Sequence, residues 1–240
     1  MTIKDKTVLV TGANRGIGQA LVAEALARGA KRVYACTRQP LAHPDDRVTP
    51  LNLDITSAAQ IQAAAGQVGS LDMLINNAGI AVPDDLTDPA ALERHLAVNL
   101  FGTYAVTRAF LPALTRSRGT IVNILSVNSL APLPHIIPAY SVSKAAAFSL
   151  TQSLRALLAA QGVTVLAVLP GPVDTDMTRG RNIPGKASPE SVALAIFNAI
   201  DNGEEDIFPD PASAPMADSW RNSAAKALER QLAQLAPVSA

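Results

Sequence analysis

Two side chains in the middle of the chain have the types and the spacing needed for proton transfer. Tyr140 and Lys144 lie four residues apart in the segment AYSVSKAA, residues 139–146. On a helix this spacing places both side chains on one face, so that the ammonium group lies near the phenol. The structural alternative is a solvated helix face with an incidental lysine.

The charge of Lys144 is large enough to change the acidity of Tyr140. Lowering the pKa of a phenol from about 10 to about 7 requires roughly 4 kcal/mol. A unit charge ~4 Å away supplies about that much at an effective dielectric constant of about 20. The sequence therefore predicts that Lys144 lowers the pKa of Tyr140 and makes it a usable acid.

This chemistry needs no metal ion, and we expect none. His43, His95 and His135 are scattered along the sequence without the spacing of metal ligands. We expect each of the three histidines to lie at the surface or in a loop.

A glycine-rich segment near the start of the chain suits a phosphate ligand. VTGANRGIGQA, residues 10–20, contains Gly12, Gly16 and Gly18 between an apolar run and an amphipathic segment. Glycines here allow a tight turn and let a diphosphate approach the backbone N–H groups of a helix N-terminus. Many strand–helix turns contain a glycine for geometry alone, but this context favours a dinucleotide-binding loop.

Two arginines indicate which dinucleotide. In the dinucleotide-binding fold, an acidic residue after the second strand holds the adenosine 2′-hydroxyl. The corresponding segment here, ACTRQ, has no carboxylate and contains Arg38, while Arg15 lies inside the glycine loop. Guanidinium groups suit a 2′-phosphate through charge-assisted, bidentate bonds, so we expect NADP(H) rather than NAD(H). The alternative for each arginine is a solubilising surface charge.

These residues must be positioned by alternating strands and helices. Near-continuous apolar strands joined by helices predict an α/β fold, a doubly wound Rossmann-type sheet that is mostly parallel, with about seven strands and helices on both faces. We expect strands at residues 6–12, 31–37, 47–54, 71–77, 119–126 and 163–170, with a possible strand at 205–209. We expect helices at residues 17–28, 57–68, 99–116 (in one or two pieces), 140–160, 189–200 and 217–235.

Composition limits the classes of function. Hydrophobic residues make up 48% of the 240 residues, which suits one domain over residues 1–240 with a sheet buried on both faces. Twenty basic and twenty acidic side chains cancel, so the chain lacks the field that would gather nucleic acid or anionic lipid. A single cysteine, Cys36, and a short apolar stretch near the N-terminus predict a cytoplasmic protein without a membrane partner.

Taken together, the motifs resemble those of the short-chain dehydrogenase/reductase family, over nearly the whole chain. The resemblance implies transfer of a hydride between a nicotinamide and a carbonyl carbon, with Tyr140 as general acid and Ser126 as a second hydrogen-bond donor. It also implies that Lys144 holds the nicotinamide ribose and that Asn99 shapes its helix so that a water links Lys144 to solvent. We expect the positive ring of an oxidised nicotinamide to assist Lys144 in lowering the pKa of Tyr140. The matching motifs are Thr11-Gly12-x3-Gly16-x-Gly18, Asp54, Asn76-Asn77-Ala78-Gly79, Asn99, Ser126, Tyr140-x3-Lys144 and Pro170-Gly171.

The resemblance also implies a set of cofactor contacts. Asp54 would contact the adenine ring, unless it is an ordinary strand-end cap, and Val173 and Thr175 would meet the nicotinamide carboxamide. The alternative for Pro170 and Gly171 is that they form a plain turn without contacting the cofactor. The full set of expected cofactor residues is Gly12, Asn14, Arg15, Gly16, Ile17, Gly18, Arg38, Asp54, Asn77, Ala78, Gly79, Tyr140, Lys144, Pro170, Gly171, Val173 and Thr175.

The position of the catalytic serine departs from the family pattern. Ser126 lies 14 positions before Tyr140, more than is usual in the family, and Ser129 lies 11 positions before it, fewer than is usual. We favour Ser126, because VNILSV aligns with the family's ending of the fifth strand. The extra residue then belongs to the proline-rich loop that follows.

Substrate and assembly are less visible in the sequence. Candidate substrate contacts are Asn128, Leu133, His135 and Met177, in mostly apolar surroundings, so we expect a small, apolar ketone or aldehyde. The short segment after Pro170 predicts a small substrate lid. By resemblance, we expect a homodimer or homotetramer formed through residues 99–116 and 140–160. Two alternatives stay open: an NAD-dependent alcohol dehydrogenase of the same fold, and a non-enzymatic regulator that senses dinucleotides.

Overall fold

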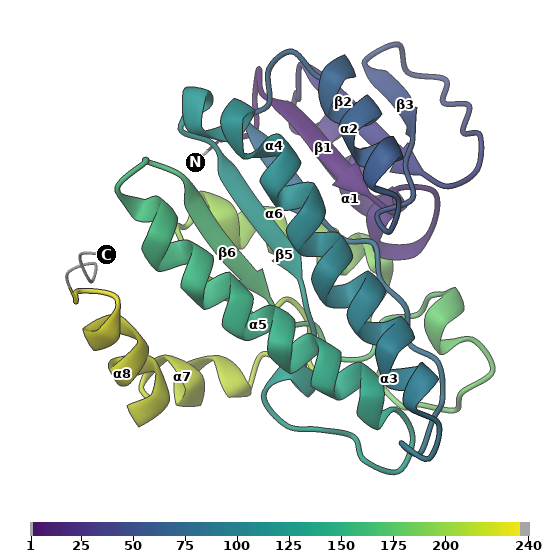
Figure 1. Ribbon diagram of the computed structural model, residues 1–240, viewed down its shortest axis with the longest axis vertical. Coiled ribbons are helices and arrows are strands. Elements are labelled where there is room, and N and C mark those ends of the chain that lie inside the picture. The colour runs from purple at the N-terminus through teal and green to yellow at the C-terminus, as the bar shows by residue number, and fades with distance from the viewer. Residues whose placement is uncertain (1, 236–240) are drawn as a thin grey trace.

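A computed structural model describes residues 2–235 and shows a seven-stranded parallel sheet with helices on both faces (Figure 1). The strand order is β3-β2-β1-β4-β5-β6-β7, and each neighbouring pair is parallel. The expected doubly wound Rossmann-type fold is confirmed. The strands are β1 (Thr7–Thr11), β2 (Arg32–Thr37), β3 (Val48–Asn52), β4 (Met73–Asn76), β5 (Thr120–Ile124), β6 (Thr164–Val168) and β7 (Asp206–Ile207).

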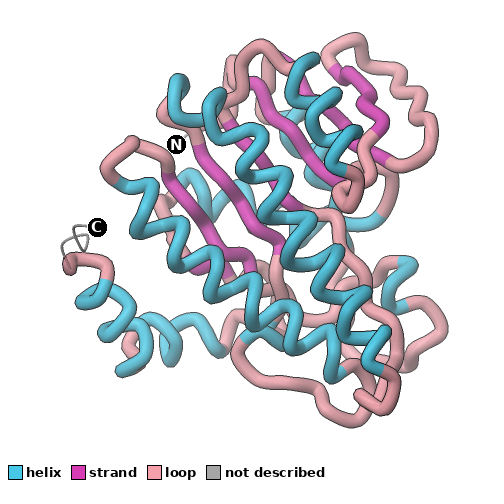
Figure 2. The backbone as a smooth tube through the Cα atoms, viewed as in Figure 1, coloured by secondary structure: helices cyan, strands magenta, loops and turns pink. Residues whose placement is uncertain are grey.

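Helices connect most of these strands, although β3 follows β2 without a helix between them. Figure 2 distinguishes helices from strands by colour. The α-helices are α1 (Gly16–Ala27), α2 (Ala58–Gln67), α3 (Pro89–Leu96), α4 (Thr103–Ser117), α5 (Pro138–Ala159), α6 (Pro189–Asp201), α7 (Met216–Arg221) and α8 (Ala224–Leu232). The part of the chain that the structure describes also contains three short helices: the π-helix η1 (Ala97–Gly102) and the 3₁₀-helices η2 (Val127–Ser129) and η3 (Asp176–Thr178). None of the helices within residues 2–235 has the length and apolarity needed to cross a bilayer.

The sheet is buried on both faces, which explains why its strands are apolar throughout. In β1, Val8 and Val10 pack with side chains of α1 and α6. Leu9, between them, points to the opposite face and packs with α2, α4 and α5. Each fully buried side chain of this size contributes roughly 1.5–3 kcal/mol. The carboxyl ends of the parallel strands meet at one edge of the sheet, where the predicted site residues also lie.

Two expected helices differ from the structure. The helix expected at residues 99–116 starts inside the π-helix η1 and continues as α4. The helix expected at residues 217–235 is two helices, because Asn222 ends α7 and Ser223 caps α8 by accepting a hydrogen bond from the Lys226 backbone N–H. The possible strand at residues 205–209 is a two-residue strand, β7.

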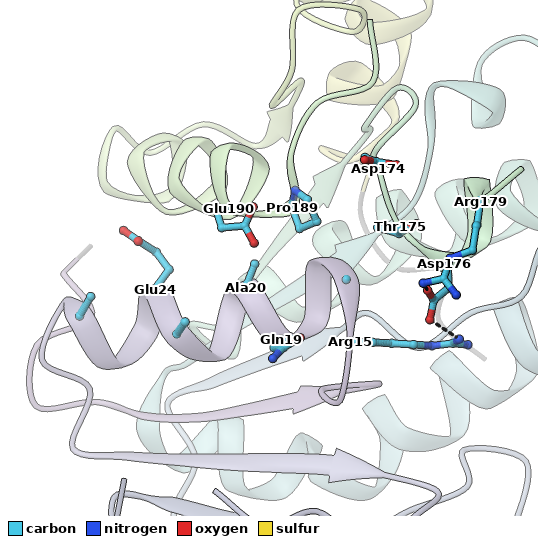
Figure 3. Close-up of a pocket in the computed structure, with 13 residues that line it drawn as sticks. Arg15, Gln19, Ala20, Glu24, Asp174, Thr175, Asp176, Arg179, Pro189 and Glu190 are labelled. Atoms are coloured by element: carbon cyan, nitrogen blue, oxygen red, sulfur yellow. Dashed lines mark hydrogen bonds and ion pairs between the residues drawn. The ribbon is translucent and has the colours of Figure 1, made fainter. Parts of the chain in front are cut away.

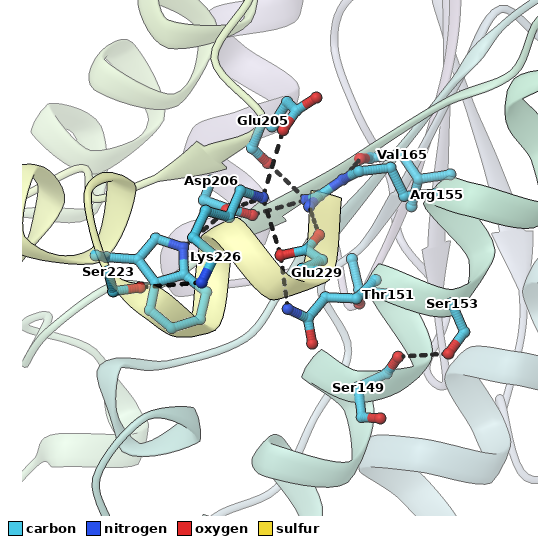
Figure 4. Close-up of polar contacts among 12 residues, drawn as sticks. Ser149, Thr151, Ser153, Arg155, Val165, Glu205, Asp206, Ser223, Lys226 and Glu229 are labelled. Carbon is cyan, nitrogen blue, oxygen red and sulfur yellow. Dashed lines mark hydrogen bonds and ion pairs between the residues drawn. The ribbon is translucent and has the colours of Figure 1, made fainter. Parts of the chain in front are cut away.

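A buried ion-pair network holds the two C-terminal helices against α5 and β7 (Figure 4). Lys226, 2% exposed, pairs with Asp206 at 2.7 Å and with Glu229 at 3.0 Å. Arg155 of α5 pairs with the same two carboxylates, at 2.7 and 2.6 Å. The Trp220 indole N–H also donates to Asp206, at 2.8 Å. Asp206 is therefore the hub that joins α5, β7, α7 and α8.

Candidate active site

The glycine loop has the shape of an anion cradle. Gly12 and Gly16 have φ values of +66° and +52°, which glycine adopts without strain. A Cβ on Gly18 would lie 2.1 Å from the Gly12 carbonyl oxygen, so that position also requires glycine. Helix α1 begins at Gly16, and no described side chain caps it. Its first N–H groups are therefore directed out of the loop, where they fit a diphosphate.

Residues after β4 hold this loop in place. The Thr11 hydroxyl accepts hydrogen bonds from the backbone N–H groups of Asn77 and Ala78, both at 3.0 Å. The Asn77 side-chain amide donates to the carbonyl oxygens of Thr11 and Gly12, at 2.9 and 3.1 Å. Asn76, buried in the sheet, donates to Asn123 of β5 at 2.9 Å. The NNAG motif thus fixes the glycine loop to the central strands.

The predicted phosphate ligand Arg15 has a different partner in the structure. Its guanidinium lies 2.9 Å from the Asp176 carboxylate, and Arg179 pairs with the same carboxylate (Figure 3). Asp176 belongs to η3, so this ion pair joins the glycine loop to the loop that follows β6. The Arg15 side chain is 62% exposed and binds Asp176 through Nη1, so its contact with a 2′-phosphate stays a prediction. Sequence reasoning missed this link, because the two residues are 161 positions apart.

A cavity of about 740 Å³ adjoins this ion pair. Its walls include the predicted cofactor residues Arg15, Gly16 and Thr175, together with the outer face of α1 and the start of α6 (Figure 3). The remaining predicted residues of the loop, Asn14 and Ile17, are exposed and half-buried respectively. The structure thus leaves open space beside the loop.

Two polar residues occupy the ends of β2 and β3. Arg38 is exposed directly after β2, and its charge contributes to a lowered pKa of the Asp54 carboxyl. The larger cause of that lowered pKa is hydrogen bonding from Thr56, whose hydroxyl and backbone N–H donate at 2.7 and 2.9 Å. Asp54 therefore makes the strand-end turn that was its structural alternative, and its contact with adenine stays a prediction.

Three predicted catalytic side chains meet at the end of β5. Tyr140 and Lys144 of α5 are 8% and 6% exposed, and Ser126 follows β5 in an equally buried position. The Ser126 side chain hydrogen-bonds to Tyr140. The Lys144 ammonium lies 5.7 Å from the centre of the Tyr140 ring and donates to the Ile124 carbonyl oxygen at 2.8 Å. Buried phenol, hydroxyl and ammonium groups are thus collected in one place.

The acidity of Tyr140 differs from the sequence-based expectation. Burial raises the pKa of Tyr140, and the hydrogen bond from Ser126 lowers it by less, so the phenol is a weaker acid than free tyrosine. For the protein alone the expected lowering of this pKa is not found, because burial is the larger influence. The effect of the positive ring of an oxidised nicotinamide, which the expectation included, stays a prediction. Burial also lowers the pKa of Lys144, to about 8.

The structure distinguishes the two candidate serines. Ser126 caps η2, with its hydroxyl accepting from the Asn128 backbone N–H at 3.1 Å, and it reaches Tyr140. The Ser129 hydroxyl is buried and has no hydrogen-bond partner among the described residues. The geometry therefore favours Ser126, in agreement with the strand alignment.

Asn99 is a structural clamp as well as a predicted catalytic residue. From the π-helix η1 its side chain donates to the Ile80 carbonyl oxygen and accepts from the Ile80 N–H, both at 2.9 Å. It also donates to the Ser143 hydroxyl at 2.9 Å. A Cβ on Gly79 would lie 3.1 Å from the Asn99 amide oxygen and 3.6 Å from the Lys144 ammonium, which explains the glycine. The predicted water link to Lys144 stays a prediction.

His95 was wrongly expected at the surface or in a loop. It lies on α3 with 1% exposure, because α3 packs this side of its surface against α5 and the segment after β4. Its ring contacts the Tyr140 ring edge-on, with centroids 6.4 Å apart and the planes at 75°. His43 and His135, in contrast, do lie in loops.

The segment after β6 meets the same edge of the sheet. The Pro170 carbonyl oxygen accepts from the Val127 N–H at 3.0 Å, and the Gly171 N–H donates to the buried Asp210 carboxylate at 2.8 Å. Val173 is buried and forms an isolated parallel β-bridge with Ala187. Thr175 caps η3, so this predicted nicotinamide contact is held next to Gly16. Nothing in the sequence had indicated that Asp210 would hold this segment.

The predicted substrate contacts lie in two loops. Asn128 is half-buried on η2, and Leu133 and His135 are exposed in the loop before α5. Met177 is exposed on η3. Their contact with a substrate stays a prediction.

Comparison with known proteins identifies the family. The family model described as short chain dehydrogenase matches residues 6–184. A crystal structure of a short chain dehydrogenase from Burkholderia cenocepacia in complex with NADP is 36% identical, has a TM-score of 0.85, and is similar over 97% of this chain and 99% of its own. The NADPH-bound carbonyl reductase from chicken fatty liver is 28% identical with a TM-score of 0.77, over 83% of this chain and 88% of its own.

A curated relative adds to this picture. The 2-(S)-hydroxypropyl-CoM dehydrogenase 3 of Xanthobacter autotrophicus is 37% identical over 206 residues, which are 78% of this chain and 79% of that protein. The fold, the glycine loop and the buried Tyr–Lys pair define a dinucleotide-binding oxidoreductase. The chain belongs to the short-chain dehydrogenase family.

Proposed function

We propose that the chain is an NADPH-dependent reductase of small, apolar ketones or aldehydes. The observation that carries the proposal is the buried contact of Tyr140 with Ser126 and Lys144 at the carboxyl end of the sheet. The NADP-bound and NADPH-bound relatives support the choice of cofactor, as do Arg38 and the absence of an acid in the segment ACTRQ. The name of the chicken enzyme supports the choice of carbonyl reduction.

Each part of the cofactor has candidate contacts in this chain. The N–H groups at the start of α1 would bind the diphosphate, and Arg38 would bind the 2′-phosphate. Val173 and Thr175 would face the nicotinamide carboxamide, and Lys144 would hold the neighbouring ribose. When bound, the reduced nicotinamide supplies the hydride.

Tyr140 supplies the proton. As the carbonyl oxygen gains negative charge, the phenol donates its proton to that oxygen, and Ser126 donates a second hydrogen bond. At neutral pH the phenol is protonated before the carbonyl group arrives, because its ordinary pKa is about 10 and burial raises it. The Lys144 charge then stabilises the phenolate, since opposite charges attract strongly where water is excluded. The reverse sequence would oxidise an alcohol.

The test is oxidation of NADPH with a panel of ketones, aldehydes, sugars and thioesters, repeated with NADH. We expect turnover of small apolar carbonyl compounds with NADPH. Faster turnover with NADH would favour the alternative of an NAD-dependent dehydrogenase. Binding of NADPH without turnover of any carbonyl compound or alcohol would favour the dinucleotide-sensing regulator.

A further inference from the structure

His95 is fixed in one orientation by hydrogen bonds on both sides of its ring. The Nε2 atom lies 3.1 Å from the backbone nitrogen of Val82, and Nδ1 lies 2.7 Å from the Ala91 carbonyl oxygen. A backbone N–H can only donate, so Nε2 must be the unprotonated acceptor. A carbonyl oxygen can only accept, so Nδ1 carries the proton. These contacts assign a neutral ring in a single tautomer.

His95 and Asn99 together clamp the segment after β4. They are four positions apart on consecutive helical turns, and Asn99 binds both backbone groups of Ile80 while His95 binds the N–H of Val82. The same segment continues to Asp84, whose carboxylate accepts from the Ala139 N–H at the start of α5, at 3.2 Å. The orientation of His95 is therefore tied to the end of α5 that carries Tyr140.

The His95 ring also contacts Tyr140 directly. The two rings pack edge-to-face, an arrangement that aromatic pairs favour. Polar or charged groups beside the Tyr140 side chain include Ser126 before η2, Lys144 on α5 and His95 on α3. The Ser143 hydroxyl donates to the Tyr140 backbone carbonyl oxygen at 2.7 Å. Ser126 and Lys144 act on the phenol oxygen and its charge, whereas His95 restricts the ring itself.

We propose that His95 is a positioning residue for the proton transfer: its ring, packed edge-to-face against the Tyr140 ring, holds that ring in the orientation from which the phenol reaches the substrate oxygen. The predicted effect of His95 on turnover rests on the proposed function. Its structural part, the contact that shields Tyr140 from water, is measurable without any substrate.

Two substitutions separate the ring contact from the hydrogen bond. His95→Phe keeps an aromatic ring beside Tyr140 and loses the acceptor for Val82, while His95→Gln keeps an acceptor and loses the ring. We expect kcat to fall about tenfold in His95→Gln, which is about 1.4 kcal/mol, and to stay within about threefold of wild type in His95→Phe. The NADPH dissociation constant and the substrate KM should stay near wild type in both. Glu93→Gln, at an exposed position on the same helix, is the control.

Ultraviolet titration of the cofactor-free protein provides the second readout. Each protein is compared with the same protein carrying Tyr140→Phe, so that the difference reports the ionisation of Tyr140. Burial raises the pKa of Tyr140, and loss of the His95 ring lets water approach. We therefore expect a lower Tyr140 pKa in His95→Gln and an unchanged one in His95→Phe.

The outcomes are distinguishable. A wild-type kcat and Tyr140 titration in His95→Gln would overturn the proposal, and so would a tenfold loss of kcat in His95→Phe with NADPH binding intact. Parallel loss of kcat and NADPH binding in both variants would indicate a purely structural role and also overturn it. If wild type reduces no carbonyl compound, the proposed function fails, while the titration still decides whether His95 shields Tyr140.

Discussion

Tyr140 and Lys144 lie one turn apart on α5, yet the Lys144 ammonium bonds to the Ile124 carbonyl oxygen and faces the Tyr140 ring at 5.7 Å from its centre. The lysine is thus a fixed, buried charge beside the phenol. Burial of both groups has opposite effects on their acidity: the pKa of Tyr140 rises and that of Lys144 falls. Both shifts reflect the cost of placing charge away from water.

Lys144→Met should stabilise the protein at neutral pH while removing its activity. The pKa of Lys144 falls from 10.5 to about 8, so at neutral pH folding buries a charge at a cost of about 3 kcal/mol. The substitution removes this cost but also loses the hydrogen bond to Ile124, which is worth about 1 kcal/mol. We therefore expect a net gain of about 2 kcal/mol in the free energy of unfolding. Denaturant unfolding measures this gain, and kcat should fall by about 10² or more.

The pH dependence of the free energy of unfolding tests the same effect of burying Lys144. Between about 8 and 10.5 the unfolded chain holds the Lys144 proton and the folded protein does not, so wild-type stability should rise with pH relative to that of Lys144→Met. The buried Cys36 thiol, whose pKa is raised from 9.0 to about 12, opposes the rise equally in both proteins. Lys144→Met should lack this rise, and the control Lys31→Met, at an exposed position, should keep it. A destabilised Lys144→Met protein at neutral pH would contradict the account.

The two serines should differ sharply when replaced. Ser126→Ala removes the hydrogen bond to Tyr140, and we expect kcat/KM to fall by about 10². Ser129→Ala removes a hydroxyl without a described partner, and kcat/KM should stay within about threefold. Steady-state kinetics with the best carbonyl substrate decides, and the opposite ranking would transfer the catalytic role to Ser129.

Arg38→Asp should weaken the preference for NADPH. A carboxylate after β2 repels a 2′-phosphate and can accept a hydrogen bond from the 2′-hydroxyl of NAD. We expect the NADPH dissociation constant to rise by about tenfold or more, or about 1.4 kcal/mol, with a smaller change for NADH. Arg32→Asp, at the opposite end of β2, is the matched control. Equal weakening in both variants would show that the effect is net charge alone.

Asp206→Asn should loosen the C-terminal helices. Burial alone would raise the pKa of Asp206, but Arg155, Lys226 and Trp220 together lower it. This carboxylate therefore stabilises the fold above its ordinary pKa of 3.8, and that stability is lost as the pH falls through the lower folded value. Removing one partner of a buried ion pair costs about 3 kcal/mol at neutral pH.

The single tryptophan offers a direct measurement of this effect. Trp220 donates to Asp206, so its fluorescence should report detachment of α7 at lower denaturant concentration in Asp206→Asn. Asp218→Asn, at an exposed carboxylate on α7, is the control. Identical unfolding curves for Asp206→Asn and Asp218→Asn would contradict the assignment of Asp206 as the hub.

The sequence predicted the features that depend on local pattern. Apolar runs marked the strands, and the glycine spacing in residues 10–20 marked the first turn, because backbone geometry demands glycine there. The positions of Tyr140 and Lys144 on one helical face followed from their spacing alone. Substrate identity, the water near Asn99 and the association of chains through α4 and α5 stay predictions.

Features that depend on distant contacts could not be predicted. The partner of Arg15 is 161 positions away, and the burial of His95 follows from the packing of α3 against α5. In the protein alone burial raises the pKa of Tyr140, and the sequence showed the charge of Lys144 but not the extent of this burial. In each case tertiary packing decided what residue type and spacing left open.

The central claim is that Tyr140 is the proton donor, and Tyr140→Phe tests it most directly. NADPH dissociation constants and single-substrate kcat/KM values are measured for both proteins with the carbonyl compound that wild type reduces fastest. We expect kcat/KM to fall by about 10²–10⁴ while NADPH binding changes by less than about twofold. Turnover at the wild-type rate by Tyr140→Phe, with NADPH still bound, would contradict the account.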